Sequence, residues 1–370
     1  ELNTMNANIK KVIVAGGGTG GHLFPAIAIG EELESDGILV KHIGSRNGIE
    51  SNGKFIDKDK IELLDLKGIS RGYSIQSIIN NIQLIFKIMK SYIKVKKIIK
   101  NFKPDLVIGT GGYSCAIPLY IALKKNINTA IQEQNVLPGM VTQKLANKVK
   151  IIFISFNETK NYLKNDNCYL TGNPIRKQIK KIDPIKSKDR FNLDLEKFTI
   201  LIIGGSQGAR SINIHFKENY KQYIDMNIQL IWQTGNQSAD IVDEINNSNI
   251  RKLDFIDDIE NAYSASDLIV SRAGATAISE ILYLGKPSIL IPYPHASENH
   301  QELNAEALDS KGLAIMVKEE ELTNGVLENK IFKLISSKNK IKKMEVNALN
   351  FSNSNASKLI KQKIEEIILC

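Results

Sequence analysis

The stretch Lys11-Val-Ile-Val-Ala-Gly-Gly-Gly-Thr-Gly-Gly-His-Leu-Phe-Pro25 decides the fold prediction for this chain. Its apolar, partly β-branched start predicts a short buried strand, and the apolar pattern from Leu23 to Leu33 predicts a helix. A strand, a glycine turn and a helix N-terminus together suit phosphate binding, because glycines let the backbone approach the anion and free N–H groups point at it. The turn also delivers an imidazole, that of His22.

The same device recurs at Leu106-Val-Ile-Gly-Thr-Gly-Gly-Tyr-Ser-Cys115 and at Phe198-Thr-Ile-Leu-Ile-Ile-Gly-Gly-Ser-Gln-Gly-Ala209. Strands alternating with helices predict parallel α/β sheets. A charged segment between Arg176 and Phe198 has little periodicity and is predicted to be a linker. From Glu320 onward only helices are expected. The chain of 370 residues therefore predicts two doubly wound, Rossmann-like domains, whose carboxyl-end loops we expect to face a common cleft.

Further strands are expected at short apolar runs in both halves: 38–43, 61–66, 129–133, 151–155 and 168–172 in the first, and 228–232, 252–255, 268–270, 288–291 and 313–317 in the second.

Composition narrows the class of protein. The three cysteines are scattered, which is typical of a reducing cytosol and argues against a disulfide framework or zinc ribbon. No apolar run is long enough to span a bilayer. The net charge of +9 would suit nucleic acid or anionic lipid. Nucleic acid is not expected, because no helix-turn-helix, zinc or aromatic-stacking motif accompanies the charge.

A basic amphipathic helix is predicted from Ile75. Its apolar face comprises Ile75, Ile78, Ile79, Ile82, Ile85, Phe86, Met89 and Ile93, and no acid lies between Lys87 and Lys103. Such a helix can lie on an anionic membrane surface, or it can be an ordinary crossover helix packed on the sheet. We favour the packed arrangement for most of the helix, and membrane contact for its first half and neighbouring loops.

Gly16-x-Gly18-x-x-Gly21 also matches the dinucleotide-binding fingerprint, which makes an NADP-dependent reductase a competing hypothesis. The fingerprint requires an acid at the end of the second strand to hold the ribose hydroxyls. This chain has His42-Ile-Gly-Ser-Arg46 there, which disfavours NAD and leaves only weak support for NADP.

A second anion site is indicated by Ser271-Arg-Ala-Gly-Ala-Thr-Ala-Ile-Ser-Glu280. Small residues at a helix start would let a phosphate lie on the N–H groups of Ala275 and Thr276. Glu280, one turn later, could accept hydrogen bonds from a ribose diol. Alone, the motif could equally be a tightly packed helix start with a solvent-facing Glu. It is followed, however, by the polar loop Pro292–Gln301, which opens another helix near the same sheet edge.

Six motifs occur in the order found in the MurG family of glycosyltransferase family 28, which the chain resembles over nearly its whole length. They are Gly-Gly-Thr-Gly-Gly-His (17–22), Glu-Gln-Asn (133–135), Gly-Asn-Pro-Ile-Arg (172–176), Gly-Gly-Ser-Gln-Gly-Ala (204–209), Phe-Ile-Asp-Asp (255–258) and Gly-Ala-Thr-Ala-Ile-Ser-Glu (274–280). The resemblance implies a GT-B fold whose last helix returns to the first domain. The acceptor and membrane-associating domain would comprise 1–175 plus 352–370, and the UDP-GlcNAc domain 176–351.

The resemblance also implies an activity. Members of this family transfer N-acetylglucosamine from UDP-GlcNAc, with inversion, to the C4 hydroxyl of undecaprenyl-pyrophosphoryl-MurNAc-pentapeptide. That places the chain in peptidoglycan synthesis, and hence in cell-wall biogenesis, cell shape and division. It would act peripherally at the cytoplasmic face of the bacterial inner membrane, with wall-synthesis proteins as possible partners. Another GT-B lipid glycosyltransferase or a UDP-GlcNAc 2-epimerase remains an alternative.

Carried over by motif, the resemblance gives the donor contacts. The Ile256 backbone would meet uracil and Glu280 the ribose. The remaining donor-binding set is Thr19, Gly20, Gly21, Asn135, Arg176, Ser206, Ala275, Thr276, Ala277, Ile278, Ser279 and Gln301, and the acceptor-pyrophosphate set is Gly17, Gly18, Gly111, Gly112 and Tyr113. Two residues depart from the family pattern: Gln132 and His300 stand where a His and a Gln are common.

The reaction needs a general base for the acceptor hydroxyl. His22 is the first candidate, about evenly balanced against a structural or phosphate-binding role, and Glu133 is the second. No cofactor is expected to be required, although a divalent metal could stimulate turnover, because a helix N-terminus and Arg176 can stabilise the leaving UDP. Asp57-Lys-Asp59 lies in a lysine-rich loop far from the donor motifs, so we expect no metal there.

Overall fold

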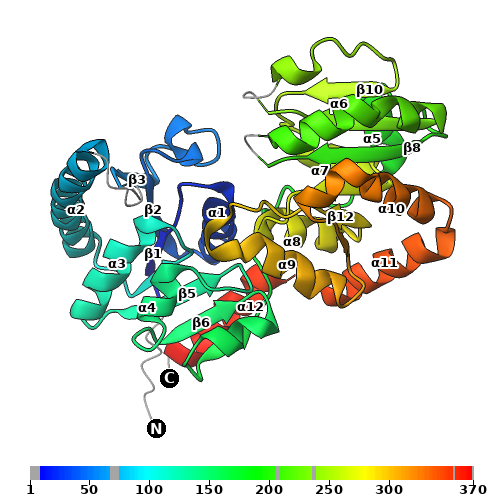
Figure 1. Cartoon of the computed structure of the whole chain (residues 1–370). Coiled ribbons are helices and arrows are strands. Elements are labelled where there is room, and N and C mark those ends of the chain that lie inside the picture. Colours follow the sequence, from blue (N-terminus) through cyan, green and yellow to red (C-terminus); the bar gives the residue numbers. More distant parts are fainter. Residues whose placement is uncertain (1–8, 67–74, 206–207, 236–238, 353–354, 369–370) are drawn as a thin grey trace, which may run out of the picture. The chain divides into compact units, whose positions relative to one another are not determined.

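The computed structural model describes residues 9–66, 75–205, 208–235, 239–352 and 355–368 (Figure 1). Contacts divide the chain into two compact units, the N-terminal unit of residues 1–176 with 355–370 and the C-terminal unit of residues 177–354. The sequence-based division places these boundaries at 175/176 and 351/352. Each unit is a parallel α/β sheet covered by helices, which confirms the predicted GT-B class of fold.

The N-terminal unit contains a seven-stranded parallel sheet. Its order is β3 (Ile61–Leu64), β2 (Leu39–Ser45), β1 (Lys11–Ala15), β4 (Leu106–Gly109), β5 (Asn128–Glu133), β6 (Ile151–Ile154) and β7 (Cys168–Leu170). Side chains alternate between the two faces of each strand. On one face Val12 and Val14 pack with α1 (Gly20–Glu34) and the C-terminal α12 (Ala356–Ile368). On the other, Ile13 and Ala15 pack with α2 (Ile75–Phe102) and α3 (Tyr113–Lys124).

The C-terminal unit contains a six-stranded parallel sheet. Its order is β10 (Ile250–Leu253), β9 (Ile228–Gln233), β8 (Phe198–Ile203), β11 (Leu268–Ser271), β12 (Ser288–Leu290) and β13 (Ile315–Met316). Trp232 and Phe216 are fully buried in its core. The α-helices that follow β8 in this unit are α6 (Arg210–Asp225), α7 (Ile259–Ala265), α8 (Ala275–Leu284), α9 (His300–Asp309), α10 (Val326–Ile335) and α11 (Lys338–Phe351).

The structure corrects the prediction that the segment between Arg176 and Phe198 is a linker. The segment contains α5 (Pro184–Arg190), which packs against α7 within the C-terminal unit. Asp183 caps this helix by accepting a hydrogen bond from the Ile185 N–H, and Pro184 follows at the first helical position. A helix of seven residues is too short to show apolar periodicity, so its charges dominated the sequence pattern.

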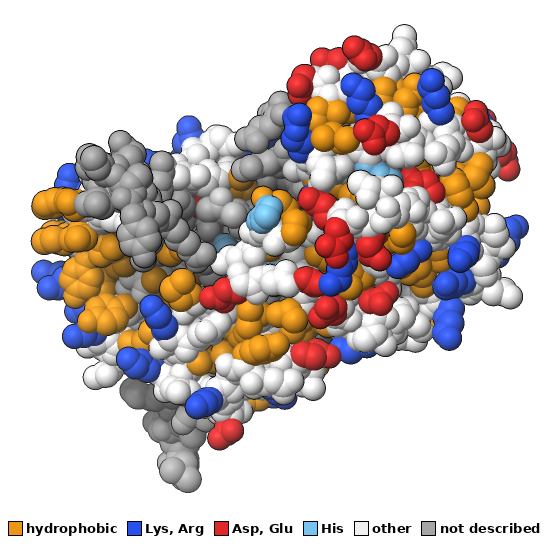
Figure 2. Space-filling view, in the orientation of Figure 1, with side chains coloured by type: hydrophobic (Ala, Val, Ile, Leu, Met, Phe, Trp, Pro, Cys, Tyr) orange, Lys and Arg blue, Asp and Glu red, His pale blue; other side chains and the backbone are white. Residues whose placement is uncertain are grey.

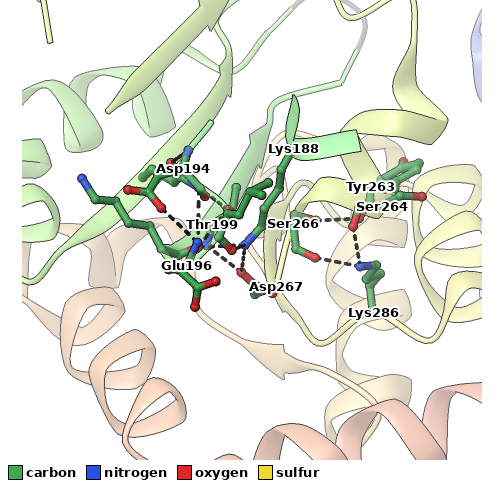
Figure 3. A network of polar contacts seen from close by, with 12 residues as sticks. Lys188, Asp194, Glu196, Thr199, Tyr263, Ser264, Ser266, Asp267 and Lys286 are labelled. Atoms are coloured by element: carbon green, nitrogen blue, oxygen red, sulfur yellow. Dashed lines mark hydrogen bonds and ion pairs between the residues drawn. The ribbon is translucent and has the colours of Figure 1, made fainter. Parts of the chain in front are cut away.

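A polar network closes the amino ends of the strands in the C-terminal unit (Figure 3). The buried Lys188 ammonium donates to the carbonyls of Leu195 and Lys197 and pairs with Asp267, which also accepts the Thr199 N–H. Lys286 donates to the carbonyls of Ser264 and Ser266, and burial lowers the pKa of its ammonium. The opposite, carboxyl ends of these strands are where ligands bind in such sheets.

Candidate functional site

Strand order locates one ligand-binding edge in each unit. In doubly wound sheets ligands bind beyond the carboxyl ends of two adjacent strands from which the chain runs in opposite directions. In the N-terminal unit these strands are β1 and β4, and in the C-terminal unit they are β8 and β11. Each of the four strands runs into one of the glycine-containing turns singled out from the sequence.

The first turn leads directly into α1, which begins at Gly20 rather than at the predicted Leu23. Thr19 is its N-cap residue, with an extended backbone and no side-chain cap. Glycine has a low helix propensity, so the pair Gly20-Gly21 concealed the true start. His22 therefore lies in the first turn of the helix, and its N–H donates to the Thr19 carbonyl at 3.2 Å. Thr19 Oγ1 lies 3.3 Å from His22 Nδ1.

The half-buried imidazole of His22 packs against the second glycine turn. A Cβ on Gly111 would lie 2.4 Å from His22 Cδ2, and one on Gly112 would lie 3.2 Å from Nδ1. Both glycines have positive φ, 103° and 75°. Thr110 adds a further tie, since its hydroxyl donates to the His22 carbonyl at 2.8 Å. The structure therefore brings His22 and the predicted acceptor glycines together, and Tyr113 follows as the half-exposed first residue of α3.

Glu133, the second candidate base, ends β5 with its side chain buried. One carboxylate oxygen accepts the Asn135 N–H at 3.1 Å, and the other accepts the Gly139 N–H at 3.0 Å and the Thr142 hydroxyl at 2.6 Å. Burial raises the pKa of this carboxyl, and the hydrogen bonds oppose that effect. These contacts fix the loop that carries Asn135.

Gln132 is completely buried. Its amide donates to Asn173 Oδ1 at 3.1 Å and to Ser155 Oγ at 3.4 Å. Gln134 donates in turn to Gln132 Oε1 and to the Thr110 carbonyl. This departure from the family pattern therefore lies in a buried network that reaches the strand end beside His22.

In the C-terminal unit, α8 starts at Ala275 with Gly274 as N-cap and no capping side chain. The backbone N–H groups of Ala275, Thr276 and Ala277 thus form an uncapped helix N-terminus at the edge of β11, as the sequence predicted. Within this turn Ser279 donates to the Ala275 carbonyl, and Ile278 points into the core.

Glu280 is buried rather than solvent-facing. The Tyr263 hydroxyl of α7 donates to its Oε2 at 3.1 Å and orients the carboxylate. Ile256, in the loop after β10, is also buried, and Gln301 Oε1 accepts the Tyr293 N–H at 3.0 Å. His300 begins α9, with Nδ1 2.8 Å from the Ser297 carbonyl. Ser206 lies outside the described residues.

Arg176 lies in the N-terminal unit. Its guanidinium stacks on the Phe24 ring of α1, 3.8 Å from the ring centroid.

Two charged residues at these edges were missed from the sequence. Arg272, at the end of β11, is buried and donates to the carbonyls of Ile291 and Pro292, to Ser211 Oγ and to Glu319. Glu50, in the short 3-10 helix η1 (Ile49–Asn52), is buried beneath the first glycine turn. In the sequence, Glu50 is distinguished only by its neighbouring glycines, Gly44 and Gly48 before it and Gly53 after it.

Family models match both units. The glycosyltransferase family 28 N-terminal domain matches residues 12–154, and the C-terminal domain of the same family matches residues 199–364. A UDP-N-acetylglucosamine–N-acetylmuramyl-(pentapeptide) pyrophosphoryl-undecaprenol N-acetylglucosamine transferase from Christiangramia forsetii is 36% identical over 97% of this chain and 98% of its own. The enzyme of the same name from Thermodesulfovibrio yellowstonii is 38% identical over 97% and 99%. The chain belongs to glycosyltransferase family 28.

Solved structures agree with membership of family 28. The crystal structure of Acinetobacter baumannii MurG superposes with a TM-score of 0.73 at 27% identity, over 96% of this chain and 99% of that one. The UDP complex of Staphylococcus aureus MnaA superposes with a TM-score of 0.71 at 14% identity, over 98% of both chains. The second likeness shows the fold alone, so it adds nothing to the epimerase alternative. With the family established, the reductase hypothesis is set aside.

Proposed function

We propose that the protein transfers N-acetylglucosamine from UDP-GlcNAc to the C4 hydroxyl of undecaprenyl-pyrophosphoryl-MurNAc-pentapeptide, with inversion, in peptidoglycan synthesis. The observation that carries this proposal is full-length similarity, at 36–38% identity, to two transferases named for this reaction. The geometry supports it, because each unit presents a glycine-rich turn at the strand edge where a phosphate can lie.

The donor is assigned to the C-terminal unit. N–H groups at the start of α8 would hold the diphosphate, since an uncapped helix N-terminus attracts anions. Glu280, oriented by Tyr263, would accept hydrogen bonds from the ribose. The backbone at Ile256 would meet the uracil, and Gln301 the sugar.

The acceptor is assigned to the N-terminal unit, where His22 would act as general base. In the displacement the acceptor oxygen bonds to the anomeric carbon, its proton passes to the imidazole, and the electron pair of the broken bond leaves with UDP. An imidazole suits this step near neutral pH, and general bases contribute roughly a hundredfold to ten-thousandfold. Glu133 is less suited, because both of its oxygens already accept hydrogen bonds that hold the Asn135 loop.

Turnover is expected to proceed without a metal cofactor, since the α8 N-terminus can stabilise charge on the leaving UDP. Within the described ranges no three His, Cys, Asp or Glu side chains are grouped to hold a metal ion. Turnover in EDTA should therefore persist, with at most modest stimulation by added magnesium. Complete loss in EDTA, restored by magnesium, would refute this part of the proposal.

The N-terminal unit also offers a surface for an anionic membrane. Within α2, Val95 and Ile99 pack into the core, whereas Ile82, Ile85, Phe86, Met89 and Ile93 are more than half exposed. Figure 2 shows hydrophobic side chains gathered there, with Lys and Arg around them. Apolar side chains bordered by cations favour an anionic lipid surface. None of the helices in the described ranges could cross a bilayer. The exposed apolar face of α2 and its lysines support peripheral association, which we place at the cytoplasmic face of the membrane.

An acceptor-dependent UDP-release assay tests the proposed function. The purified protein should release UDP from UDP-GlcNAc only when the lipid-linked muramyl acceptor is added, and the lipid should gain one N-acetylglucosamine. UDP release without acceptor, or conversion of the sugar to its 2-epimer, would point to the epimerase instead. His22→Gln should lower kcat at least a hundredfold; wild-type kcat in that variant would exclude the imidazole as base.

A further inference from the structure

The Glu50 carboxylate is held inside the fold directly behind the first glycine turn. The residue is 1% exposed, and its Oε1 accepts two backbone hydrogen bonds, from Gly18 at 2.9 Å and from Ser45 at 2.6 Å. Burying a carboxylate is costly unless hydrogen bonds replace its water. Its Oε2 is buried and has no hydrogen-bond partner among the described residues. The fold therefore keeps a carboxylate that is costly to bury. The carboxylate holds the Gly18 N–H of the turn and the Ser45 N–H at the end of β2.

Three glycines leave the space that this carboxylate fills. A Cβ on Gly17 would lie 2.0 Å from Glu50 Oε1, one on Gly48 2.2 Å from Oε2, and one on Gly44 2.9 Å from Oε1. These glycines come from the turn, from β2 and from the segment before η1. A real Cβ does not approach an oxygen this closely, so a side chain at any of these three positions would clash with Glu50 in its present position. Glycine at all three leaves room for the carboxylate.

The turn held by Glu50 is coupled to His22. The Gly16 N–H donates to the Ile43 carbonyl of β2, and the Gly18 N–H donates to Glu50 of η1. Both ends of the turn are therefore held by the segment that comprises β2 and η1. Gly18 has a φ of 92°, a left-handed conformation that the second bond helps to fix. The missing Cβ of Gly112 would lie 2.6 Å from the Gly17 carbonyl oxygen and 3.2 Å from His22 Nδ1. A displaced turn would therefore displace the backbone on which the imidazole rests.

We infer that Glu50 is a positioning residue, which holds the Gly16–Gly18 turn and, through Gly112, His22 in the arrangement that receives the acceptor pyrophosphate. For its ligand the inference rests on the proposed function. Within the turn, the Gly16 and Gly18 N–H groups are bonded to the Ile43 carbonyl and to Glu50. The N-terminus of α1, which follows the turn, would then hold the anion. What the site needs from Glu50 is an oxygen acceptor rather than its charge.

The test compares Glu50→Gln with Glu50→Leu. The Gln amide oxygen can accept both N–H bonds, and its NH2 group would take the place of the oxygen that has no partner; Leu has a similar size and no acceptor. In Glu50→Leu the acceptor KM should rise, or kcat fall, by at least tenfold, with donor KM within twofold of wild type. Glu50→Gln should stay within threefold on every parameter. Glu62→Leu, a half-buried carboxylate on β3, is the matched control and should leave acceptor kinetics unchanged.

Hydrogen exchange separates this inference from the proposed function. The peptide covering residues 16–22 should exchange at least tenfold faster in Glu50→Leu than in wild type or Glu50→Gln, whatever reaction the enzyme catalyses. Wild-type exchange in Glu50→Leu, an effect of Gln equal to that of Leu, or equal losses for donor and acceptor would each overturn the positioning role. A wild-type protein with no acceptor-dependent UDP release would refute the proposed function while the exchange result still decides the role of Glu50.

Discussion

Replacing Gly111 by Ala tests the contact between the second glycine turn and His22. The new Cβ would lie 2.4 Å from His22 Cδ2, and the residue would have to keep a φ of 103°. A left-handed conformation costs an L-residue about 1–2 kcal/mol, and overpacking of this kind costs roughly 1–3 kcal/mol more. We therefore expect the N-terminal unit to lose ~2–5 kcal/mol of unfolding free energy, and kcat to fall because the imidazole is displaced.

Gly37→Ala is the matched control. Gly37 follows α1 in the same unit with a φ of 79°, and a Cβ there would meet nothing within 4 Å. This variant should lose only the conformational cost of about 1–2 kcal/mol and keep wild-type kcat. The difference between the two variants isolates the crowding of His22.

Two spectroscopic probes separate the units during urea unfolding. Trp232 is the single tryptophan of the chain and is fully buried in the C-terminal unit, so its fluorescence reports that unit. Far-UV circular dichroism reports both. Gly111→Ala should move the dichroism transition and leave the fluorescence transition in place. Equal stability losses in the two variants, together with wild-type kcat in Gly111→Ala, would refute the proposed packing of His22.

Three further outcomes are expected. Burial, with a smaller contribution from Lys60, lowers the pKa of His42 from 6.5 to about 4. The unfolded chain therefore binds the proton first, and stability present above pH 6.5 should fall as pH drops, by about 2 kcal/mol at pH 5; His42→Gln should flatten this dependence in dichroism-monitored unfolding. Lys188→Met should cost the Trp232-monitored transition roughly 1–3 kcal/mol, because it leaves buried carbonyls unpaired, without changing UDP release by the folded enzyme. Phe86→Glu should weaken co-sedimentation with anionic vesicles at least tenfold, whereas Leu39→Glu, equally exposed on β2, should not.

Local sequence signals were sufficient to predict the sheets and the positions of the glycine turns. Apolar runs that end at glycines predicted β1, β4 and β8, because strand period and turn chemistry are properties of adjacent residues. Glu50 and Arg272 could not be predicted in this way, since their partners are distant in the chain: Glu50 bonds Gly18, and Arg272 bonds Ser211. The covering of Glu280 by Tyr263 was missed for the same reason.

Gln132 shows how structure changes the meaning of a departure from a family pattern. The sequence alone predicts that Gln in place of the common His removes an imidazole from the cleft. In the structure the side chain is buried, and it donates to Asn173 while accepting from Gln134. A neutral imidazole has one donor and one acceptor, so a His here could keep the bonds to Asn173 and from Gln134 and would lose only the longer bond to Ser155, whose hydroxyl still donates to the Glu133 carbonyl.

It follows that Gln132→His should retain both stability and kcat, whereas Gln132→Leu should lose about 1–3 kcal/mol for each buried partner left unpaired. Because Gln134 also donates to the Thr110 carbonyl, and Thr110 donates to the His22 carbonyl, Gln132→Leu should lower kcat as well. Dichroism-monitored unfolding and the UDP-release assay measure the two effects. A Gln132→His variant as impaired as Gln132→Leu would contradict the hydrogen-bond argument. At this buried position His can still donate and accept hydrogen bonds, whereas Leu can do neither.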